Sequence, residues 1–432
     1  MSFEFSGLSG WKPPDDYEEV QSSVPGITVF APRPENSDIR EKVKKFECPQ
    51  CGADTKYNVS AGGVACEHCG YVASIEVKHV GTSAEQFEFT LETVSEAEQG
   101  WGVKRQELHC NNCGAEITLV EGEISTNCPF CTSSKVNIQT AKSDVLRPRF
   151  LVPFKIKPEE TGVKEWLGKG WFHPKELSSS SNVKDFSGIY MPFWTFDADI
   201  FSRWEAEVGH EESESYYDSD TKEHKTKTEI HWQWKKGHVS LNIDDLLING
   251  SSHTSRIILE KLYPFDMNGL VEYNPDFLAG WKAQAYDVTL TKAWDEGKSV
   301  IRNKAKGACY SDTGSSHIRN FSMTADMSGE KWRYILLPVY ISAYMFKNKV
   351  YQIMVNGQTG KVAGQRPVIW WHVWSLIVLM LLPGGLLGLI GLPLLFLGGV
   401  GIVPLILGFI LLIFGIIGSV WLHNYAVNEE AA

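Results

Sequence analysis

The chain contains two copies of one cysteine pattern: Cys48-Pro-Gln-Cys51 with Cys66-Glu-His-Cys69, and Cys110-Asn-Asn-Cys113 with Cys128-Pro-Phe-Cys131. Each C-x2-C turn can hold two thiolates on one tetrahedral Zn²⁺, and the 14 residues between the two turns of a set suit a β-hairpin. The repeat predicts two small β zinc ribbons in tandem, over 46–80 and 108–140, joined by a Glu-rich linker over 81–107.

Two zinc ions held by eight thiolates are expected to be structural. Four thiolates complete the coordination of zinc, whereas a catalytic zinc keeps one position open for water or substrate. Pairing within each set is favoured by the short spacer, and an interleaved pairing of the turns stays open. The predicted ligands are Cys48, Cys51, Cys66, Cys69, Cys110, Cys113, Cys128 and Cys131.

The residue after the second cysteine of each turn supports this interpretation. A zinc knuckle needs a positive φ there, which favours glycine. Gly52, Gly70 and Gly114 hold that position, and Thr132 departs from the pattern.

Three further metal-binding or nucleophilic side chains lie near or beyond these sets. His68 and His109 are alternative ligands, but four cysteines in each set leave them no place. Cys309 stands alone and is expected to be a small buried apolar residue rather than a nucleophile.

The C-terminal part of the chain has the composition of a membrane segment. No Asp, Glu, Lys or Arg occurs over 367–428, and a spanning helix needs about 20 apolar residues. This length predicts a transmembrane hairpin over 369–423, with helices over 369–392 and 402–423 and a turn rich in Gly and Pro. One kinked or re-entrant span is the alternative.

The flanks of this segment predict its orientation. Trp370, Trp371 and Trp374 at one end and Trp421 with Tyr425 at the other would meet at the same interface. Lys361 and Arg366 precede the first span, no secretory signal opens the chain, and reduced cysteines suit the cytoplasm. We therefore expect a two-span protein of the cytoplasmic membrane with both termini in the cytoplasm.

The remaining regions are an N-terminal arm and a middle domain. Residues 1–45 are rich in Pro and acidic residues, which predicts a flexible arm. Residues 146–366 show short aromatic and β-branched runs between turn signals, which predicts a β-rich or α+β domain. Met191-Pro-Phe-Trp and Leu337-Pro-Val-Tyr echo each other and suggest two related halves. The polar stretches 209–227 and 304–320 are expected to be loops.

The sequence contains no complete catalytic motif of the kinds considered below. Gly297-Lys298-Ser299 resembles the end of a phosphate-binding loop, but Lys292 stands where its first glycine belongs. Asp244 and Asp245 with Asp197 and Asp199 are candidates for cation binding or acid–base work, against the commoner role of solvated acids. The histidines at 210, 224, 231 and 238 are candidates for a second metal site or, more simply, exposed side chains. An enzyme with a site in 146–366 stays open, although none is expected.

The charge balance argues against nucleic acid as the partner. The chain carries a net charge of −11, and residues 46–145 contain 14 Asp and Glu against 6 Lys and Arg. Nucleic-acid-binding modules usually present a basic face because phosphate neutralisation supplies most of their affinity. A membrane-tethered nucleic-acid-binding protein is therefore the alternative rather than the favoured interpretation.

Cys48–Gly70, Tyr190-Met-Pro-Phe-Trp-Thr-Phe-Asp and Val355-Asn-Gly-Gln-Thr-Gly-Lys-Val resemble segments of a group of prokaryotic membrane proteins with a transcription factor IIB-type zinc ribbon. The resemblance spans most of 46–425. Some members are labelled primosomal-helicase-like, yet this sequence has no motor motif. Others are associated with flotillin-like (SPFH) or phage-shock-type membrane-stress proteins.

This resemblance implies a non-enzymatic adaptor at the cytoplasmic face of the membrane. Its partners would be the lipid bilayer and a protein, of the flotillin-like or phage-shock type, and a homo-oligomer is left open.

Overall fold

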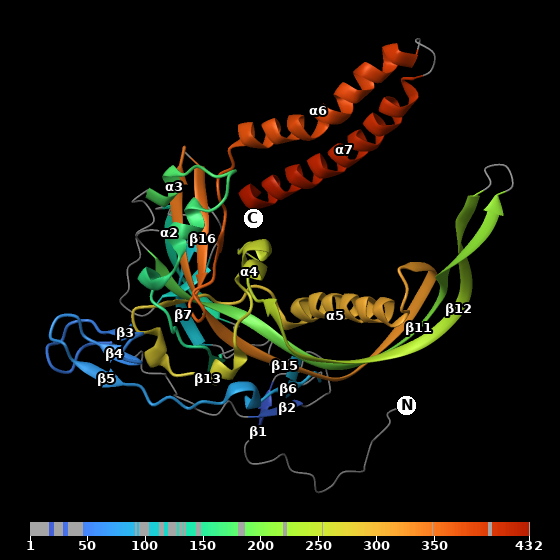
Figure 1. The fold of residues 1–432 in the computed structure, drawn as a ribbon. Helices are drawn as coiled ribbons and strands as arrows, with labels where there is room; N and C mark the ends of the chain where they lie inside the picture. The colour runs from blue at the N-terminus through green and yellow to red at the C-terminus, as the bar shows by residue number, and fades with distance from the viewer. Residues whose placement is uncertain are drawn as a thin grey trace, which may run out of the picture. The chain divides into compact units, whose positions relative to one another are not determined.

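The computed structural model describes residues 17–20, 29–32, 46–90, 93–94, 103–111, 116–119, 128, 133, 135–143, 148–179, 186–218, 223–252, 254–347, 349–395 and 400–431. These belong to two compact units, Met1–Lys45 and Phe46–Ala432. In the first unit, the predicted arm, strands β1 (Tyr17–Val20) and β2 (Val29–Pro32) pair antiparallel. The second unit carries the two β-sheets and all the helices described below (Figure 1).

The strands of the second unit form one small and one large sheet. The small sheet has the order β3 (Lys56–Asn58), β4 (Gly63–Ala65), β5 (Val72–Ser74). The described strands of the large sheet are β6 (Phe87–Glu88), β7 (Val103–Cys110), β8 (Glu116–Leu119), β9 (Val136–Ser143), β10 (Phe150–Leu151), β11 (Ser187–Asp218), β12 (Glu223–Asn249), β13 (Val271–Glu272), β14 (Lys282–Ala283), β15 (His317–Phe346), β16 (Lys349–Asn356) and β17 (Val362–Gly364). Their main order is β13-β10-β15-β11-β14-β8-β7-β9, with β12 on β11, β16 and β6 on β15, and β17 on β16.

The helices are fewer and mostly short. The α-helices are α2 (Val163–Gly168), α3 (Glu176–Ser179), α4 (Arg256–Leu262), α5 (Leu290–Asp312), α6 (Trp370–Leu395) and α7 (Ile402–Ala431), and the 3₁₀ turns are η1 (Gly81–Ser83), η2 (Pro158–Glu160), η3 (Met267–Gly269) and η4 (Pro275–Leu278). The β-rich character predicted for residues 146–366 is confirmed. The predicted linker 81–107 includes η1 and β6, and β6 pairs with β15.

The core lies on both faces of the central strands. Along β15, the even positions Trp332, Tyr334 and Leu336 belong to one buried cluster, and the odd positions Ile335 and Leu337 belong to another. A strand covered on both faces is apolar at nearly every position, since neighbouring side chains point in opposite directions. The two echoing segments pair directly in this core, with Met191 opposite Leu337.

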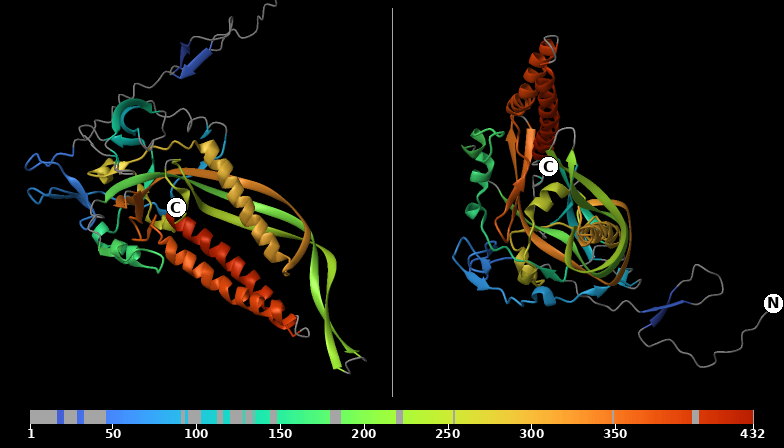
Figure 2. Two further views of the ribbon diagram at one scale, coloured as in Figure 1. Left: turned by 90° about the horizontal axis from the view of Figure 1, so that it is seen from above. Right: turned by 45° about the vertical axis from the view of Figure 1, so that its right-hand side comes forward.

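The expectation of a loop over 209–227 is wrong. The described residues of this stretch continue β11 and β12, which pair from Phe193–Asn249 to Asp218–Glu223 and form a long ribbon (Figures 1 and 2). Beyond the pairing of Gly209 with His317, β15 no longer accompanies β11. Both faces of this end are exposed, so polar residues occupy them and the alternation that identifies a half-buried strand is missing.

The expectation of a loop over 304–320 is also wrong, because α5 runs to Asp312 and β15 begins at His317. The buried face of α5 has the spacing of an amphipathic helix packed on a sheet. Its buried residues are Leu290, Ala293, Trp294, Gly297, Ile301, Ala305 and Cys309. The Gly297-Lys298-Ser299 triplet therefore lies inside this helix rather than in a phosphate-binding loop.

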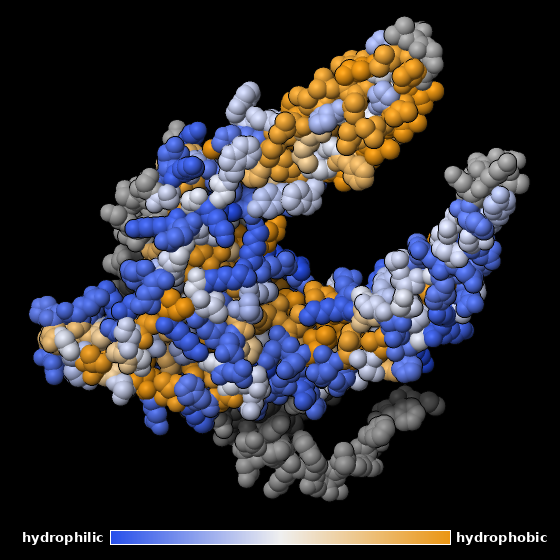
Figure 3. Space-filling view, viewed as in Figure 1, coloured by the Kyte–Doolittle hydropathy of each residue, from blue (hydrophilic) through white to orange (hydrophobic). Residues whose placement is uncertain are grey.

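Two apolar helices end the chain, and each is long enough to cross a membrane. They pack antiparallel, and the space-filling view shows their apolar surface in contrast to the hydrophilic ribbon (Figure 3). The helices exceed the predicted spans of 369–392 and 402–423: α6 continues through Pro393 to Leu395, and α7 extends to Ala431. A proline inside an apolar helix is tolerated where neighbouring groups compensate its missing hydrogen bond.

Glycines set the close approach of these two helices. A methyl group on Gly384 would lie 2.8 Å from the Gly408 carbonyl oxygen, and one on Gly391 would lie 3.2 Å from that of Gly401. Both helices place glycines at seven-residue intervals along this contact, which keeps them on one face. Gly388, four residues after Gly384, would carry a methyl group without any contact.

Candidate metal centre

The first cysteine set folds into two matching turns. The Cys48 N–H donates to the Ala53 carbonyl at 2.7 Å, and the Cys66 N–H donates to the Tyr71 carbonyl at 2.8 Å. The glycines that follow the second cysteine of each turn have positive φ, +73° at Gly52 and +77° at Gly70. The prediction of left-handed glycines is therefore confirmed at these two positions, while 114 and 132 lie outside the described residues.

These turns bring four sulfurs together. The Sγ atoms of Cys48 and Cys69 are 3.4 Å apart, those of Cys51 and Cys66 are 3.6 Å apart, and all four lie within 4.8 Å of one another. A tetrahedral ion with Zn–S bonds of about 2.3 Å places its sulfurs about 3.8 Å apart, whereas a disulfide needs about 2.05 Å. The arrangement fits one metal ion and four thiolates, and it does not fit two disulfides.

The titration of these thiols points the same way. Burial raises the pKa of the Cys48 thiol, but backbone N–H groups at Gln50 and Cys51 and the neighbouring thiols lower it more, to about 7. The Tyr71 N–H lowers the pKa of Cys69, but desolvation and the other three thiols raise it more, to about 12. One thiolate forms readily and opposes the next, so a cation is needed to hold four together.

Half of the cysteine cluster is buried, and the small sheet that carries it is bound to the main body. Cys48 and Cys66 are buried, and Cys51 and Cys69 are exposed. Between the turns, Tyr57 of β3 is buried in the main core, its N–H donates to the Ala279 carbonyl at 2.8 Å, and its ring lies 5.5 Å from that of Phe277. The small sheet is thus anchored on η4 rather than independent.

The second cysteine set is only partly described. Cys110 ends β7 and Cys128 lies near it in sequence, and both are buried within one apolar cluster of the large sheet. The Cys128 N–H donates to the Ser133 carbonyl at 2.9 Å, the same bond to the fifth following residue that the first set makes at Cys48 and Cys66. The other two predicted ligands, Cys113 and Cys131, lie outside the described residues.

The remaining ligand candidates do not join a cysteine cluster. Within the described residues, neither His68 nor His109 belongs to a group that could hold a metal ion. Cys309 is fully buried on α5 beside Trp204 and Ala206, and burial raises the pKa of its thiol. This agrees with a packing role.

The acidic candidates form a structural cluster. Asp197, Asp244 and Asp245 lie together at a bulge between β11 and β12. The Asp245 N–H donates to Asp197 Oδ1 at 2.8 Å, and the carboxylate of Asp245 pairs with the guanidinium of Arg333, a side chain only 1% exposed. Burial raises the pKa of Asp245, and the Arg333 charge opposes that rise. Arg333 therefore already supplies the positive charge that a cation would bring.

The histidine candidates are spread along the exposed ribbon. His231 pairs with Glu212 at 3.4 Å, His224 lies edge-on to Tyr217, and His238 faces Phe201. None of the described histidines joins a metal-binding group.

A cavity of about 610 Å³ lies between the end of β12, α4 and α5. Its charged lining residues bind one another, since Arg256 pairs with both Glu260 and Glu296 at 2.7 and 2.6 Å. Hydroxyl and apolar side chains make up most of the remaining lining.

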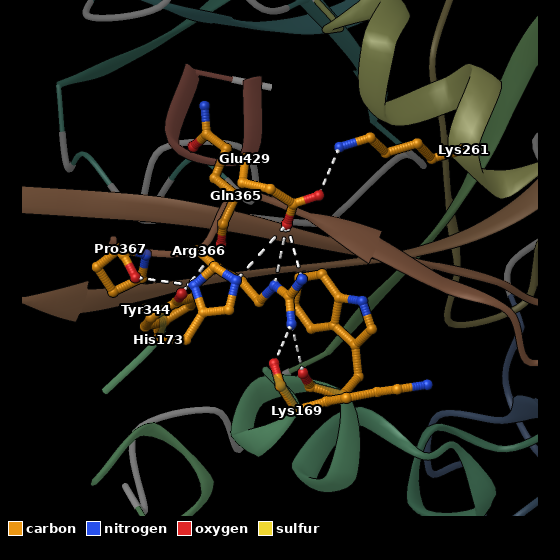
Figure 4. A network of polar contacts seen from close by, with 9 residues as sticks. Lys169, His173, Lys261, Tyr344, Gln365, Arg366, Pro367 and Glu429 are labelled. Atoms are coloured by element: carbon orange, nitrogen blue, oxygen red, sulfur yellow. Dashed lines mark hydrogen bonds and ion pairs between the residues drawn. The ribbon is translucent and has the colours of Figure 1, made fainter. Parts of the chain in front are cut away.

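The sequence interpretation missed a buried ion pair at the base of the apolar helices (Figure 4). Arg366 precedes α6, and its Nη2 donates to Glu429 of α7 at 2.7 Å, with side chains 10% and 13% exposed. Its Nη1 donates to the carbonyls of Trp166 and Lys169 at 2.9 and 2.8 Å. A guanidinium suits such multiple donation because its donors form a fixed fork.

Two further groups complete this network. Lys261 of α4 lies 3.4 Å from the other Glu429 oxygen. His173 is buried, its Nδ1 donates to the Pro367 carbonyl at 3.0 Å, and its Nε2 is 3.9 Å from Glu429. The start of α6 and the end of α7 are thereby bound to the same β-rich body. A signal was present in the sequence, because Arg366 and Glu429 flank the charge-free segment.

Comparison with known proteins gives one informative similarity. The chain is 26% identical over 330 residues to the uncharacterized protein YdjG of Bacillus subtilis (strain 168), which covers 75% of this chain and 90% of that protein. No family model and no solved structure matches.

Proposed function

We propose that this protein is a membrane-anchored zinc-ribbon adaptor that assembles a protein partner at the cytoplasmic face of the membrane. The observation that carries the proposal is the shared base of the two apolar helices. Arg366 and Glu429 bind both ends of the pair to the β-rich body, so both ends would lie on one side of a bilayer. Lys361 and Arg366 at that side favour the cytoplasm.

The four-cysteine cluster supports a structural role for zinc in this adaptor. Cys48, Cys51, Cys66 and Cys69 would hold one ion, because their sulfurs lie at suitable separations. Four thiolates would fill the coordination sphere of the ion and leave no position for a substrate. A second ion on Cys110, Cys113, Cys128 and Cys131 is part of the proposal, since the turn at Cys128 repeats the backbone hydrogen bond of the first set. When bound, zinc supplies folding energy to a sheet that has little core of its own.

Protein rather than nucleic acid is the favoured partner. The acidic balance over 46–145 opposes phosphate binding. The resemblance to proteins associated with flotillin-like or phage-shock-type systems suggests such a partner.

The test is mass spectrometry of the gently cross-linked complex extracted from membranes, with zinc quantified in the same sample. We expect one defined protein in constant ratio to the bait, lost in a Cys66→Ser variant that still enters the membrane fraction. Recovery of the bait alone would reject the adaptor, and release from membranes by carbonate would reject the anchor. Salt-sensitive retention of nucleic acid by the full chain would favour the alternative.

A further inference from the structure

The short link between α2 and α3 has the composition of a membrane-interface segment. It reads Gly168-Lys-Gly-Trp-Phe-His-Pro-Lys175, with two aromatic and two basic side chains and no acidic one. Gly170, at φ +108°, makes the turn that precedes Trp171. The Trp171 side chain is 57% exposed, although tryptophan is usually largely buried in a soluble protein.

This link is bound directly to the start of α6. The Ile369 N–H donates to the Phe172 carbonyl at 2.7 Å, and His372 Nδ1 donates to the Trp171 carbonyl at 3.0 Å. The rings of Trp171 and His372 stack at 5.0 Å with an angle of 4° between their planes. Trp171 is therefore fixed at the level of His372 along the helix axis.

The neighbours of His372 along the apolar helices are exposed aromatic residues. Trp371 and Trp374 are 77% and 52% exposed, and on α7 the stacked pair Trp421 and Tyr425 is 67% and 41% exposed. A rise of about 1.5 Å per residue puts Trp371 and Trp374 within about 3 Å of His372 along the axis. The interfacial layer on one side of a bilayer is about 5–8 Å thick.

From this continuity we infer that Trp171 is a third membrane contact, contributed by the β-rich body and seated in the headgroup layer beside the aromatic belt of α6 and α7. The inference rests on the proposed membrane anchor. Tryptophan favours this layer because its ring is amphipathic, and Lys169 and Lys175 beside it suit lipid phosphates. The body would then rest directly on the membrane instead of being held away from it.

Photo-cross-linking in liposomes of phosphatidylethanolamine and phosphatidylglycerol tests the inference. The full-length protein would carry p-benzoylphenylalanine in place of Trp171, Trp371 or Trp234, and lipid adducts would be quantified by mass spectrometry. Trp234 on β12 is the matched control, since it is also 57% exposed and does not contact the link or the helix pair through any described polar bond. We expect adducts at 171 and 371 and none at 234.

The outcomes separate this inference from the proposed anchor. Adducts at 371 without adducts at 171 would overturn the inference and leave the anchor standing. No adducts at 371 would reject the anchor and the inference together. Equal labelling at 171 and 234 would also overturn the inference, because labelling would then follow exposure alone.

A second measurement uses the native side chain. Lipids brominated near the headgroup quench nearby tryptophan fluorescence, and Trp171→Phe should remove part of the quenchable signal. Trp234→Phe should remove unquenched signal only. Equal quenching of the two variants and the wild type would contradict the inference.

Discussion

The small cysteine sheet and the apolar helix pair are both attached to the same β-rich body, but among the described residues a buried charged network occurs only in the attachment of the helices. The cysteine sheet inserts an aromatic ring, Tyr57, into the main core. The helix pair is bound by a buried charged network around Arg366 and Glu429. The helix pair also packs Phe172 of the body against Val373 and Leu422, so its charged network adds to apolar burial, whereas the cysteine sheet attaches mainly through one aromatic ring.

The largest expected effect is the loss of the metal ion proposed for the cysteine sheet. Cys66→Ser removes a buried ligand, so we expect one metal ion fewer per chain and new protease cleavage within 46–80. Elemental analysis and limited proteolysis of the purified protein measure both. Cys309→Ala removes another buried cysteine without touching the cluster and should leave the metal content unchanged. Unaltered metal in Cys66→Ser would refute the assigned ligand.

Removal of the aromatic anchor should have the next largest effect. Tyr57→Ala deletes a side chain 7% exposed, and we expect it to cost about 3–5 kcal/mol in stability. Hydrogen exchange should show the loss of protection around 275–279, where Tyr57 packs. Tyr57→Phe keeps the ring and should cost far less. Equal costs for the two variants would mean that the hydroxyl, and not ring burial, attaches the sheet.

Loss of the Arg366–Glu429 ion pair should cost less stability than loss of the Tyr57 ring, and the effects of changing the two charged residues should not be additive. Arg366→Met leaves Glu429 buried without its main partner, and we expect a loss of about 3 kcal/mol, seen as earlier thermal unfolding in detergent. The double variant Arg366→Met/Glu429→Gln should recover part of that loss, because no unpaired carboxylate remains. Strictly additive losses would show that the two side chains do not act as a pair.

The local patterns of the sequence were sufficient for the features that depend on local chemistry. The cysteine spacing predicted the cluster of Cys48, Cys51, Cys66 and Cys69, and the absence of charge predicted two apolar helices, to within a few residues at the first three of their four ends. Glycine after the second cysteine predicted the positive φ at Gly52 and Gly70. Each of these depends on residues that are close in the chain.

Features that depend on distant pairing were missed. The ribbon end of β11 and β12 is exposed on both faces, so its residues carry no alternating pattern. Helix α5 was missed because Lys292, Lys298 and Lys304 on its exposed side dominate the composition. In the sequence Arg366 indicates only the orientation of the membrane segment, because its partner Glu429 lies 63 residues further along the chain.

Substitution of His173 should have the smallest effect on stability. Because His173 belongs to the attachment of the helix pair and not to that of the cysteine sheet, its titration distinguishes the two. Burial lowers its pKa below 6.5, the carbonyl of Pro367 and the charge of Glu429 oppose this, and Arg366 adds to it. Well above pH 6.5 the side chain is neutral in the folded and unfolded states and contributes no pH dependence. As the pH falls below 6.5 the unfolded chain binds a proton more readily, so the folded state loses stability until the lowered pKa is passed.

His173→Gln should remove this contribution to the pH dependence of stability, whereas His238→Gln on the exposed ribbon should not. The measurement is the unfolding temperature in detergent between about pH 7.5 and 5.5. Acid also protonates cysteine thiolates and releases metal, but that part of the slope is common to all three proteins. A slope unchanged in His173→Gln would show that acid acts through the cysteine sheet alone.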